Sequence, residues 1–370
     1  MSGIDADERY MAAAIALARR GLGACAPNPA VGALIVKDGA ILARGWTQPG
    51  GRPHAEVEAL RQAGEKSRGS TLYVTLEPCS HHGKTPPCAE AVAASGVARV
   101  VSAIEDPDPR VAGRGHELLR AAGLDVRTGV CAQAALAANL GHVLRVTQNR
   151  PLITLKLAMT ADGFVAAGRE EPRLSITGEA ANRAVHVTRA MHDAILIGVG
   201  TALADDPLLT VRLPGLEQRR PLRIVLDSSL RISPASRLVA TARSHPTLII
   251  AGEAAPAASE ARLLAENVAI ARAPTDAAGR LDLRGALALL AARGLTRIFC
   301  EAGPTLAEAL LREDVADDII VLTSQKPLAR PGLCGFTAER INALEDGSRY
   351  RLVEQRAIGD DLLTRRERIS

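Results

Sequence analysis

One histidine, one glutamate and two cysteines are spaced in a way that suits metal-assisted hydrolysis. His54 and Glu56 lie two positions apart, where a loop rich in glycine and proline leads into an expected helix. Cys79 follows an expected strand, and Cys88 begins the next expected helix. Two thiolates and one imidazole suit a tetrahedral Zn²⁺ ion that keeps its fourth position for water. We therefore predict that His54, Cys79 and Cys88 bind zinc.

Glu56 is predicted to be the catalytic residue of this site. It lies near the metal without being needed as a ligand, so its carboxylate can take a proton from water and return it to the substrate. A His-x-Glu pattern followed by Pro-Cys and a second cysteine is typical of zinc deaminases, and here eight residues separate the two cysteines. Two alternatives are open. Either the cysteines are buried core residues, or the zinc site is closed and structural, with His81 or His82 as the fourth ligand.

The segment between the two cysteines carries more polar groups than a metal site requires. These groups are Ser80, His81, His82, Lys84 and Thr85. Such donors and cations suit an anionic group on a substrate, although a polar surface loop is the alternative. The rigid turn Pro27-Asn-Pro29 is expected to present Asn28 to the edge of a base.

A layered α/β unit is needed to bring these residues together. Apolar residues at helical spacing predict a helix over residues 5–21, and apolar runs on both sides of Asp38-Gly39 predict a β-hairpin. Further helices are expected over residues 55–63, 87–96 and 115–122, and strands over 70–76, 99–104 and 125–128. Such alternation of strands and helices is typical of an α/β fold.

A second domain is expected after residue 147, where the pattern of strands and helices starts again. A chain of 370 residues exceeds the size of one ordinary core. A helix and a connector over residues 133–150 are expected to join the domains. The expected strands of the second domain lie at residues 152–158, 194–197, 222–227, 247–251, 297–300 and 318–322.

Composition restricts the classes of function. The formal net charge is +4, the arginines are scattered, and aromatic residues make up 2% of the chain, which disfavours nucleic-acid binding. No apolar run approaches the roughly 20 residues that span a bilayer, and the acidic N-terminal residues lack the order of a signal peptide. The six cysteines show no repeated spacing, which indicates reduced thiols and a cytoplasmic protein.

Four segments carry a resemblance to a known enzyme family. They are Pro27-Asn-Pro-Ala-Val-Gly32, His54-Ala-Glu56, Thr75-Leu-Glu-Pro-Cys-Ser-His-His-Gly-Lys-Thr-Pro-Pro-Cys88 and Asp106-Pro-x-Pro-x-Val-Ala-Gly-Arg-Gly115. These segments closely resemble the bifunctional riboflavin-biosynthesis deaminase/reductases. The resemblance implies a three-layer α/β/α domain of the cytidine-deaminase type over residues 1–147, and a dihydrofolate-reductase-like α/β domain over residues 148–370.

The same resemblance implies two activities. The first is zinc-dependent deamination of 2,5-diamino-6-(5-phosphoribosylamino)pyrimidin-4(3H)-one. The second is NADPH-dependent reduction of the ribosyl group of the resulting 5-amino-6-(5-phosphoribosylamino)uracil. Because the reductase fold of this family usually dimerises, a homo-oligomer is also expected.

The second domain resembles the family's reductase at ordered motifs between residues 151 and 310. By this resemblance, NADPH is held by Ala158, Ser175, Thr201, Asp205, Ser228, Gly303, Pro304, Thr305 and Leu306. The ribose-phosphate substrate is held by Arg173, Arg189, Leu209, Arg212 and Glu301. Independently of the family, a glycine turn at a helix start, as in Gly303-Pro-Thr305, exposes backbone N–H groups to a pyrophosphate. No Gly-x-Gly-x-x-Gly opens a βαβ unit, so a Rossmann domain is not expected.

Three residues depart from the family pattern. Ser175 replaces the aromatic residue expected against the nicotinamide, Arg173 replaces a serine, and Ala302 replaces a glycine. The main alternative is therefore an active deaminase with a weak or inactive reductase. A deaminase acting on nucleic acid is a further alternative, which the cysteine spacing and the shortage of aromatics disfavour. A structural zinc module fused to a ligand-binding domain is the last.

Overall fold

The computed structural model describes residues 5–83, 85–168, 171 and 174–369. The chain forms two compact units, residues 1–149 and 150–370, so the division lies two residues beyond the expected boundary. The helix α5 (Ala132–Gln148) continues to the end of the first unit, which places the division after it. Within the described residues, no helix has the length and apolar character needed to cross a bilayer.

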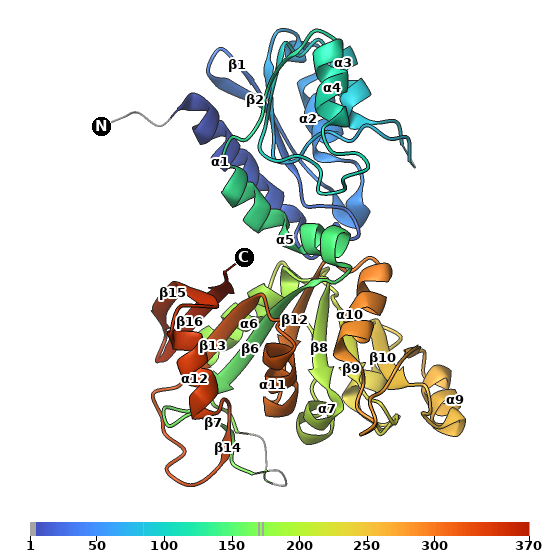
Figure 1. Ribbon diagram of the computed structural model, residues 1–370, viewed down its shortest axis with the longest axis vertical. Helices are drawn as coiled ribbons and strands as arrows, with labels where there is room; N and C mark the ends of the chain where they lie inside the picture. The colour runs from blue at the N-terminus through green and yellow to red at the C-terminus, as the bar shows by residue number, and fades with distance from the viewer. Residues whose placement is uncertain (1–4, 84, 169–170, 172–173, 370) are drawn as a thin grey trace. The chain divides into compact units, whose positions relative to one another are not determined.

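The first unit is built on a five-stranded sheet in the order β2-β1-β3-β4-β5 (Figure 1). Its strands are β1 (Gly32–Lys37), β2 (Ala40–Trp46), β3 (Thr71–Val74), β4 (Arg99–Ser102) and β5 (Asp125–Arg127). β1 and β2 form the predicted antiparallel hairpin, whose turn residues Asp38 and Gly39 have φ values of 51° and 77°. β3, β4 and β5 pair in parallel, as strands joined by helices do.

Helices cover both faces of this sheet (Figure 1). They are α1 (Ala6–Ala18) and α5 on one face, and α2 (Ala55–Ala63), α3 (Cys88–Ala94) and α4 (Arg114–Ala121) on the other. Alternation along β1 explains both cores, because successive side chains of a strand point to opposite faces. Ala33 and Ile35 are buried on the side of α2, and Leu34 and Val36 on the side of α1. The expected three-layer α/β/α fold is confirmed.

The second unit is built on a nine-stranded sheet in the order β11-β10-β9-β8-β12-β6-β13-β16-β15. Its central strands are β6 (Leu152–Met159), β8 (Ala194–Gly198), β9 (Leu222–Leu226), β12 (Arg297–Glu301) and β13 (Asp318–Thr323). β10 (Thr247–Gly252) and β11 (Ala269–Ala273) extend one side in parallel, and the hairpin β15 (Tyr350–Ile358) and β16 (Asp361–Arg368) closes the other side antiparallel. All strands from β6 to β13 in this sheet therefore end at the same edge.

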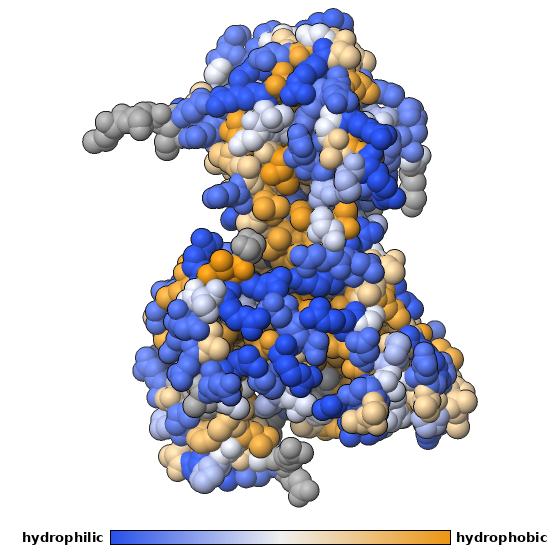
Figure 2. Space-filling model, viewed as in Figure 1, coloured by the Kyte–Doolittle hydropathy of each residue, from blue (hydrophilic) through white to orange (hydrophobic). Residues whose placement is uncertain are grey.

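Helices also cover both faces of the second sheet. They are α6 (Glu179–Ala190), α7 (Val199–Asp205), α8 (Arg237–Ala240), α9 (Ala257–Ala265), α10 (Leu283–Ala292), α11 (Pro304–Arg312) and α12 (Ala338–Glu345). Leu196 of β8 packs in the core that α10 and α11 cover, and its neighbour Ile195 packs in the core that α8 and α9 cover. Hydrophilic residues cover most of the visible face of this unit (Figure 2). The unit is thus the expected α/β domain with a central sheet.

The structure contains five strands that the sequence pattern did not predict. They are β7 (Phe164–Ala166), β11, β14 (Leu333–Cys334), β15 and β16. β7 and β14 are too short to show a period, since they have three residues and two residues. The side chains of β15 are mostly exposed on both faces, so its sequence lacks the alternation of a half-buried strand.

Candidate functional site

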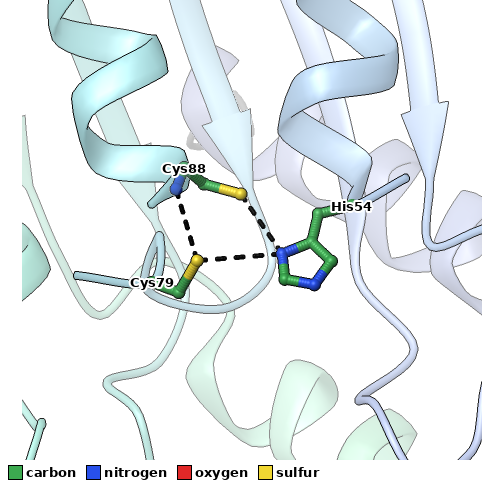
Figure 3. A group of neighbouring side chains, drawn as sticks. All are labelled: His54, Cys79 and Cys88. Atoms are coloured by element: carbon green, nitrogen blue, oxygen red, sulfur yellow. Dashed lines mark hydrogen bonds between the residues drawn. The ribbon is translucent and has the colours of Figure 1, made fainter. Parts of the chain in front are cut away.

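The three predicted zinc ligands come together in the first unit. His54 directly precedes α2, Cys79 lies in the loop after β3, and Cys88 is the first residue of α3. Their donor atoms lie within 4.8 Å of one another, and the side chains face one another (Figure 3). Nδ1 of His54 is 3.2 Å from Sγ of Cys88 and 3.8 Å from Sγ of Cys79. Three chain segments that are distant in sequence thus converge at one point.

The protonation state of Cys79 and the donor atoms of the three-residue cluster both fit a zinc ion. Hydrogen bonding with Cys88, reinforced by His54, lowers the pKa of Cys79 to about 4 although burial opposes the shift. The backbone N–H of Cys88 also donates to Sγ of Cys79, at 3.3 Å. The thiolate is the form of cysteine that binds metals. Two sulfur atoms and one nitrogen at this spacing are the donor set of a zinc site with one position left for water.

The two other histidines of the loop lie outside this group. His81 and His82 are exposed, and Nε2 of His82 lies 3.7 Å from a carboxylate oxygen of Glu90. In the described part of the chain, the cluster contains only three possible ligands. Three protein ligands are the pattern of catalytic zinc sites, whereas structural sites have four.

Glu56 lies beside the cluster, on the first turn of α2. It is 3% exposed, and its carboxyl group hydrogen bonds with the thiol of Cys88. Burial raises the pKa of Glu56 to about 7. A group that both accepts and returns a proton works best when its pKa is close to the operating pH. The position of Glu56 therefore suits the predicted proton transfer.

The turn that contains Asn28 lies against the imidazole of His54. Nδ2 of Asn28 is 3.1 Å from Nε2 of His54, and it donates to the carbonyl of Gly51 at 2.8 Å. A Cβ atom at Gly51, where φ is 84°, would lie 2.7 Å from the Asn28 side chain, so this close approach requires glycine. Contacts to the second ring nitrogen orient a metal-binding histidine. Asn28 therefore fixes the His54 ring, and its predicted contact with a base stays a prediction.

The polar loop after Cys79 forms one wall of a shallow pocket. The pocket is lined by Glu77, Pro78, Cys79, Ser80, His81, Asp106 and Val111. Arg52 donates a hydrogen bond to the hydroxyl of Thr85, and Lys84 lies outside the described residues. The predicted contact of this loop with a substrate phosphate stays a prediction.

Glu77 is a buried residue of this pocket. The sequence analysis did not single it out, because the spacing of the metal ligands gives no indication of its role. Its carboxylate accepts hydrogen bonds from the backbone N–H groups of Asp106 at 3.1 Å, Gly113 at 2.9 Å and Gly115 at 2.7 Å. A Cβ atom at Gly115 would lie 2.0 Å from the carbonyl oxygen of Pro78. Glu77 therefore ties the segment before α4 to the loop that carries Cys79. The only sequence signal was that both segments belong to the motifs of the resemblance.

Most of the predicted cofactor residues lie at one edge of the nine-stranded sheet. Ala158 is near the end of β6, Thr201 is in α7 after β8, Ser228 follows β9, and Gly303 follows β12. The carboxyl edge of parallel strands is the usual ligand-binding edge of an open α/β sheet. Because β12 pairs with β8, α7 and α11 begin side by side, and a Cβ atom at Gly303 would lie 3.1 Å from Oγ1 of Thr201.

The remaining cofactor residues occupy more varied positions. The first turn of α11 contains Pro304, Thr305 and Leu306. Helix starts have backbone N–H groups without intrahelical partners, so this turn suits the predicted pyrophosphate contact. Asp205 is the last residue of α7, and Ser175 is exposed in a stretch without helix or strand. Arg173, a predicted substrate residue, lies outside the described residues. Ala302 is partly buried against the core.

Arg189 and Glu301, both predicted to hold the substrate, form a buried ion pair. Nε and a terminal nitrogen of Arg189 lie 2.5 Å and 3.0 Å from the two carboxylate oxygens of Glu301. Although burial opposes it, Arg189 lowers the pKa of Glu301. The other terminal nitrogen of Arg189 donates to the carbonyl of Thr210 at 2.8 Å. The guanidinium thus fixes the end of β12 and the segment after α7, and the substrate roles of both residues stay predictions.

Leu209 and Arg212 lie in that segment, with opposite exposures. Leu209 is 3% exposed and has a φ of 49°, in the left-handed region. The Arg212 side chain is exposed, and one of its terminal nitrogens donates to Oγ1 of Thr210 at 3.1 Å. The backbone N–H of Arg212 donates to Nδ1 of His186 at 3.2 Å. His186 was not predicted, although it lies three positions before Arg189 on α6, on the same helix face.

Two family models match the chain, one in each unit. The cytidine and deoxycytidylate deaminase zinc-binding region matches residues 4–104, and the RibD C-terminal domain matches residues 151–363. The riboflavin biosynthesis protein RibD of Escherichia coli K12 is 43% identical, over 96% of this chain and 98% of that protein. RibD of Aquifex aeolicus is 38% identical, over 96% of this chain and 97% of that protein.

Solved structures agree with these matches over the whole chain. Acinetobacter baumannii RibD superimposes with a TM-score of 0.86 at 33% identity, covering 99% of both chains. A diaminohydroxyphosphoribosylaminopyrimidine deaminase/5-amino-6-(5-phosphoribosylamino)uracil reductase from Thermotoga maritima superimposes with a TM-score of 0.83 at 32% identity. That match covers 98% of this chain and 99% of the Thermotoga chain.

Proposed function

Because the chain belongs to the RibD family of riboflavin biosynthesis proteins, we propose that its two units catalyse successive steps of that synthesis. The first unit hydrolyses the amino group of 2,5-diamino-6-(5-phosphoribosylamino)pyrimidin-4(3H)-one and releases ammonia. The second unit reduces the ribosyl group of the resulting 5-amino-6-(5-phosphoribosylamino)uracil with NADPH. The observation that carries this proposal is the group of His54, Cys79 and Cys88 with buried Glu56 beside it.

In the first unit, we assign zinc binding to His54, Cys79 and Cys88. When bound, zinc supplies Lewis acidity and a water that ionises near neutral pH. Glu56 is assigned the proton transfers of the reaction. Glu56 accepts a proton from the attacking water and gives it to the ring nitrogen. It then accepts the second proton, from the newly added hydroxyl group, and gives it to the leaving amine, which departs as ammonia. The surroundings of Glu56 are dry, since it is 3% exposed, which strengthens its interaction with the reacting groups.

In the second unit, we assign NADPH to the carboxyl edge of β6, β8, β9 and β12. The first turn of α11 faces the neighbouring α7, so its backbone N–H groups receive the pyrophosphate. Ser228 follows the end of β9, where a hydroxyl and nearby Arg231 are placed for a 2′-phosphate. Arg212, with its exposed guanidinium, is assigned to the substrate phosphate, since arginine binds phosphate through paired hydrogen bonds.

Substitution of Glu56 by glutamine tests the deaminase assignment. The Glu56→Gln variant should retain about one zinc per chain and lose deamination by at least 10²–10⁴-fold, the usual contribution of general acid–base catalysis. Glu58→Gln is the matched control, because Glu58 lies on the same helix and pairs with Arg61. The control should deaminate at the wild-type rate. Loss of zinc from Glu56→Gln, or near-normal ammonia release by it, contradicts the assignment.

NADPH oxidation with the uracil intermediate tests the reductase assignment separately. Both glutamate variants should oxidise NADPH at the wild-type rate, because both substituted residues belong to the first unit. The exposed Ser175, where the family has an aromatic residue, favours the alternative of an active deaminase with a weak reductase. Ammonia release without NADPH oxidation by the wild-type chain supports that alternative.

We further propose that the chain forms a homo-oligomer through the second unit. β15 is the edge strand of the nine-stranded sheet, and its Leu352 and Val353 are 50% and 38% exposed. An exposed edge strand with apolar side chains is a template for pairing with another chain. Light scattering of the purified protein should give a multiple of 38.8 kDa. Leu352→Lys should lower that mass, and a wild-type mass of one chain contradicts the proposal.

We also propose that the protein works in the cytoplasm. The six cysteines form no disulfide in the structure, and reduced cysteines are typical of that compartment. Cell fractionation followed by assay of ammonia release tests this location. Activity in a fraction other than the cytoplasm contradicts it.

A further inference from the structure

Two residues of α6 hold the segment that follows α7 (residues 206–212). This segment carries Arg212, the proposed substrate arginine of the reductase. His186 and Arg189 lie one helical turn apart on α6. Arg189 donates to the carbonyl of Thr210 at 2.8 Å, and Nδ1 of His186 accepts the backbone N–H of Arg212 at 3.2 Å. The segment is therefore attached to α6 at two points, one through a carbonyl and one through an N–H group.

The segment needs such attachment because its backbone conformation is not self-supporting. Leu209 has a φ of 49°, a conformation that residues other than glycine adopt only when surrounding contacts hold it. The buried Leu209 side chain anchors the start of the segment in the core. Arg212, at the other end of the segment, is exposed, and its guanidinium donates to Oγ1 of Thr210 at 3.1 Å within the same segment. The N–H···Nδ1 bond to His186 attaches the backbone of Arg212 itself to α6.

The ring of His186 is in the form that this hydrogen bond requires. An N–H donor at Nδ1 requires a lone pair there, so the proton of the neutral ring is on Nε2. Burial, together with the cations Arg189 and Arg212, lowers the pKa of His186 to about 4. The ring is therefore neutral at physiological pH, and Nδ1 remains an acceptor.

We propose that His186 is a positioning residue of the reductase, which fixes the Arg212 backbone so that its guanidinium meets the substrate phosphate. The proposal rests on the proposed function, because it takes Arg212 as a substrate ligand. His186 itself contacts Arg212 through its backbone, so it acts on the substrate only through that residue. The effect should appear in binding of the phosphorylated uracil, and neither in NADPH binding nor in the deaminase.

Three substitutions of His186 separate the hydrogen bond from the bulk of the ring. His186→Phe keeps a ring without an acceptor, and His186→Ala removes the ring if phenylalanine does not fold. His186→Asn places an amide oxygen where Nδ1 lies, so it restores the acceptor. Phenylalanine and alanine should raise the KM for the uracil substrate about three- to tenfold, the value of one net hydrogen bond. Asparagine should stay within twofold of wild type, and kcat, the KM for NADPH and ammonia release should not change.

Arg212→Gln is measured beside these variants to separate the two proposals. If Arg212→Gln raises the substrate KM while His186→Phe and His186→Ala leave it unchanged, the positioning role is wrong and the proposed function stands. If Arg212→Gln leaves the KM unchanged, the assignment of Arg212 to the substrate is wrong, and the positioning role is overturned with it. If His186→Phe and His186→Ala change kcat, both KM values and the melting temperature together, and asparagine does not rescue them, His186 is only structural and the proposal is overturned.

Discussion

Asp7 joins the first helix of the chain to three strands of the first unit through four hydrogen bonds to its carboxylate. Its carboxylate accepts two hydrogen bonds from Arg99 of β4, at 2.9 Å and 2.8 Å, and one from the hydroxyl of Tyr73 of β3, at 2.7 Å. Arg127 of β5 donates to it at 2.5 Å. Asp7 is 4% exposed. We predict that Asp7→Asn destabilises the first unit.

The size of the effect follows from the pKa of Asp7. Hydrogen bonding with Arg99 lowers that pKa from 3.8 to about 2, although burial opposes the shift. A shift of this size corresponds to about 2 kcal/mol of stability at neutral pH. The guanidinium groups are partly exposed, with 31% of the Arg99 side chain and 46% of the Arg127 side chain accessible. Solvent screening reduces the expected loss in Asp7→Asn to about 1–2 kcal/mol.

The sign of the pH dependence is fixed, because the pKa is lower in the folded state. The stabilisation is fully present above pH 3.8 and is lost as the pH falls toward 2. The difference between wild type and Asp7→Asn should therefore be constant from pH 7 to pH 5. At pH 3 it should fall to about half, since the unfolded chain is then mostly protonated at this position.

Urea unfolding followed by tryptophan fluorescence measures this difference in the intact chain. Trp46 is the only tryptophan of the sequence and lies in β2, so its signal reports the first unit alone. Both proteins share any loss of metal at low pH, so comparing them at each pH removes that contribution. Asp5→Asn is the matched control, because Asp5 is exposed, forms an ion pair with Arg127, and caps α1 through a hydrogen bond from the Asp7 backbone N–H that asparagine can also accept. A loss below about 0.5 kcal/mol at pH 7, or a difference that grows as the pH falls, refutes the reasoning.

Three further predictions concern both units. Glu77→Gln should keep its zinc but lower kcat/KM for ammonia release at least about tenfold, because an NH₂ group replaces one of the two carboxylate oxygens and cannot accept the backbone N–H bonds made to that oxygen. Unchanged deamination would count against this role. The wild-type protein should prefer NADPH to NADH by roughly 10- to 100-fold, and Ser228→Asp should reverse this preference, because a carboxylate repels the 2′-phosphate. The preference is measured as kcat/KM for each cofactor. Equal use of the two cofactors by the wild-type protein rules out 2′-phosphate recognition at Ser228. Burial lowers the pKa of His192 to about 3, from 6.5. The second unit should therefore lose about 2 kcal/mol between pH 7 and pH 5, as the unfolded chain takes up a proton, and His192→Gln should flatten that slope in circular-dichroism melts.

Features that depend on residues close together in the chain could be predicted from the sequence. The hairpin at Asp38-Gly39 and the helix over residues 55–63 were predicted, because turn residues and helical spacing act over a few positions. The order and spacing of His54, Cys79 and Cys88 predicted a zinc site, and the structure brings these three side chains together. The family resemblance implied the two activities, and the matching family models confirm it.

Contacts between polar groups on different elements could not be predicted from the sequence, because they depend on how the chain folds. Arg189 and Glu301 were both expected to hold substrate, and the fold pairs them with each other, although 112 positions separate them. Glu77 reaches N–H groups up to 38 positions away, and Asp7 reaches Arg127 across 120 positions. Such contacts have no period or spacing in the sequence, because they form where separate elements pack together. The edge strand β15 escaped prediction for a related reason: its pairing with β16 places it in the sheet, and no buried face marks it in the sequence.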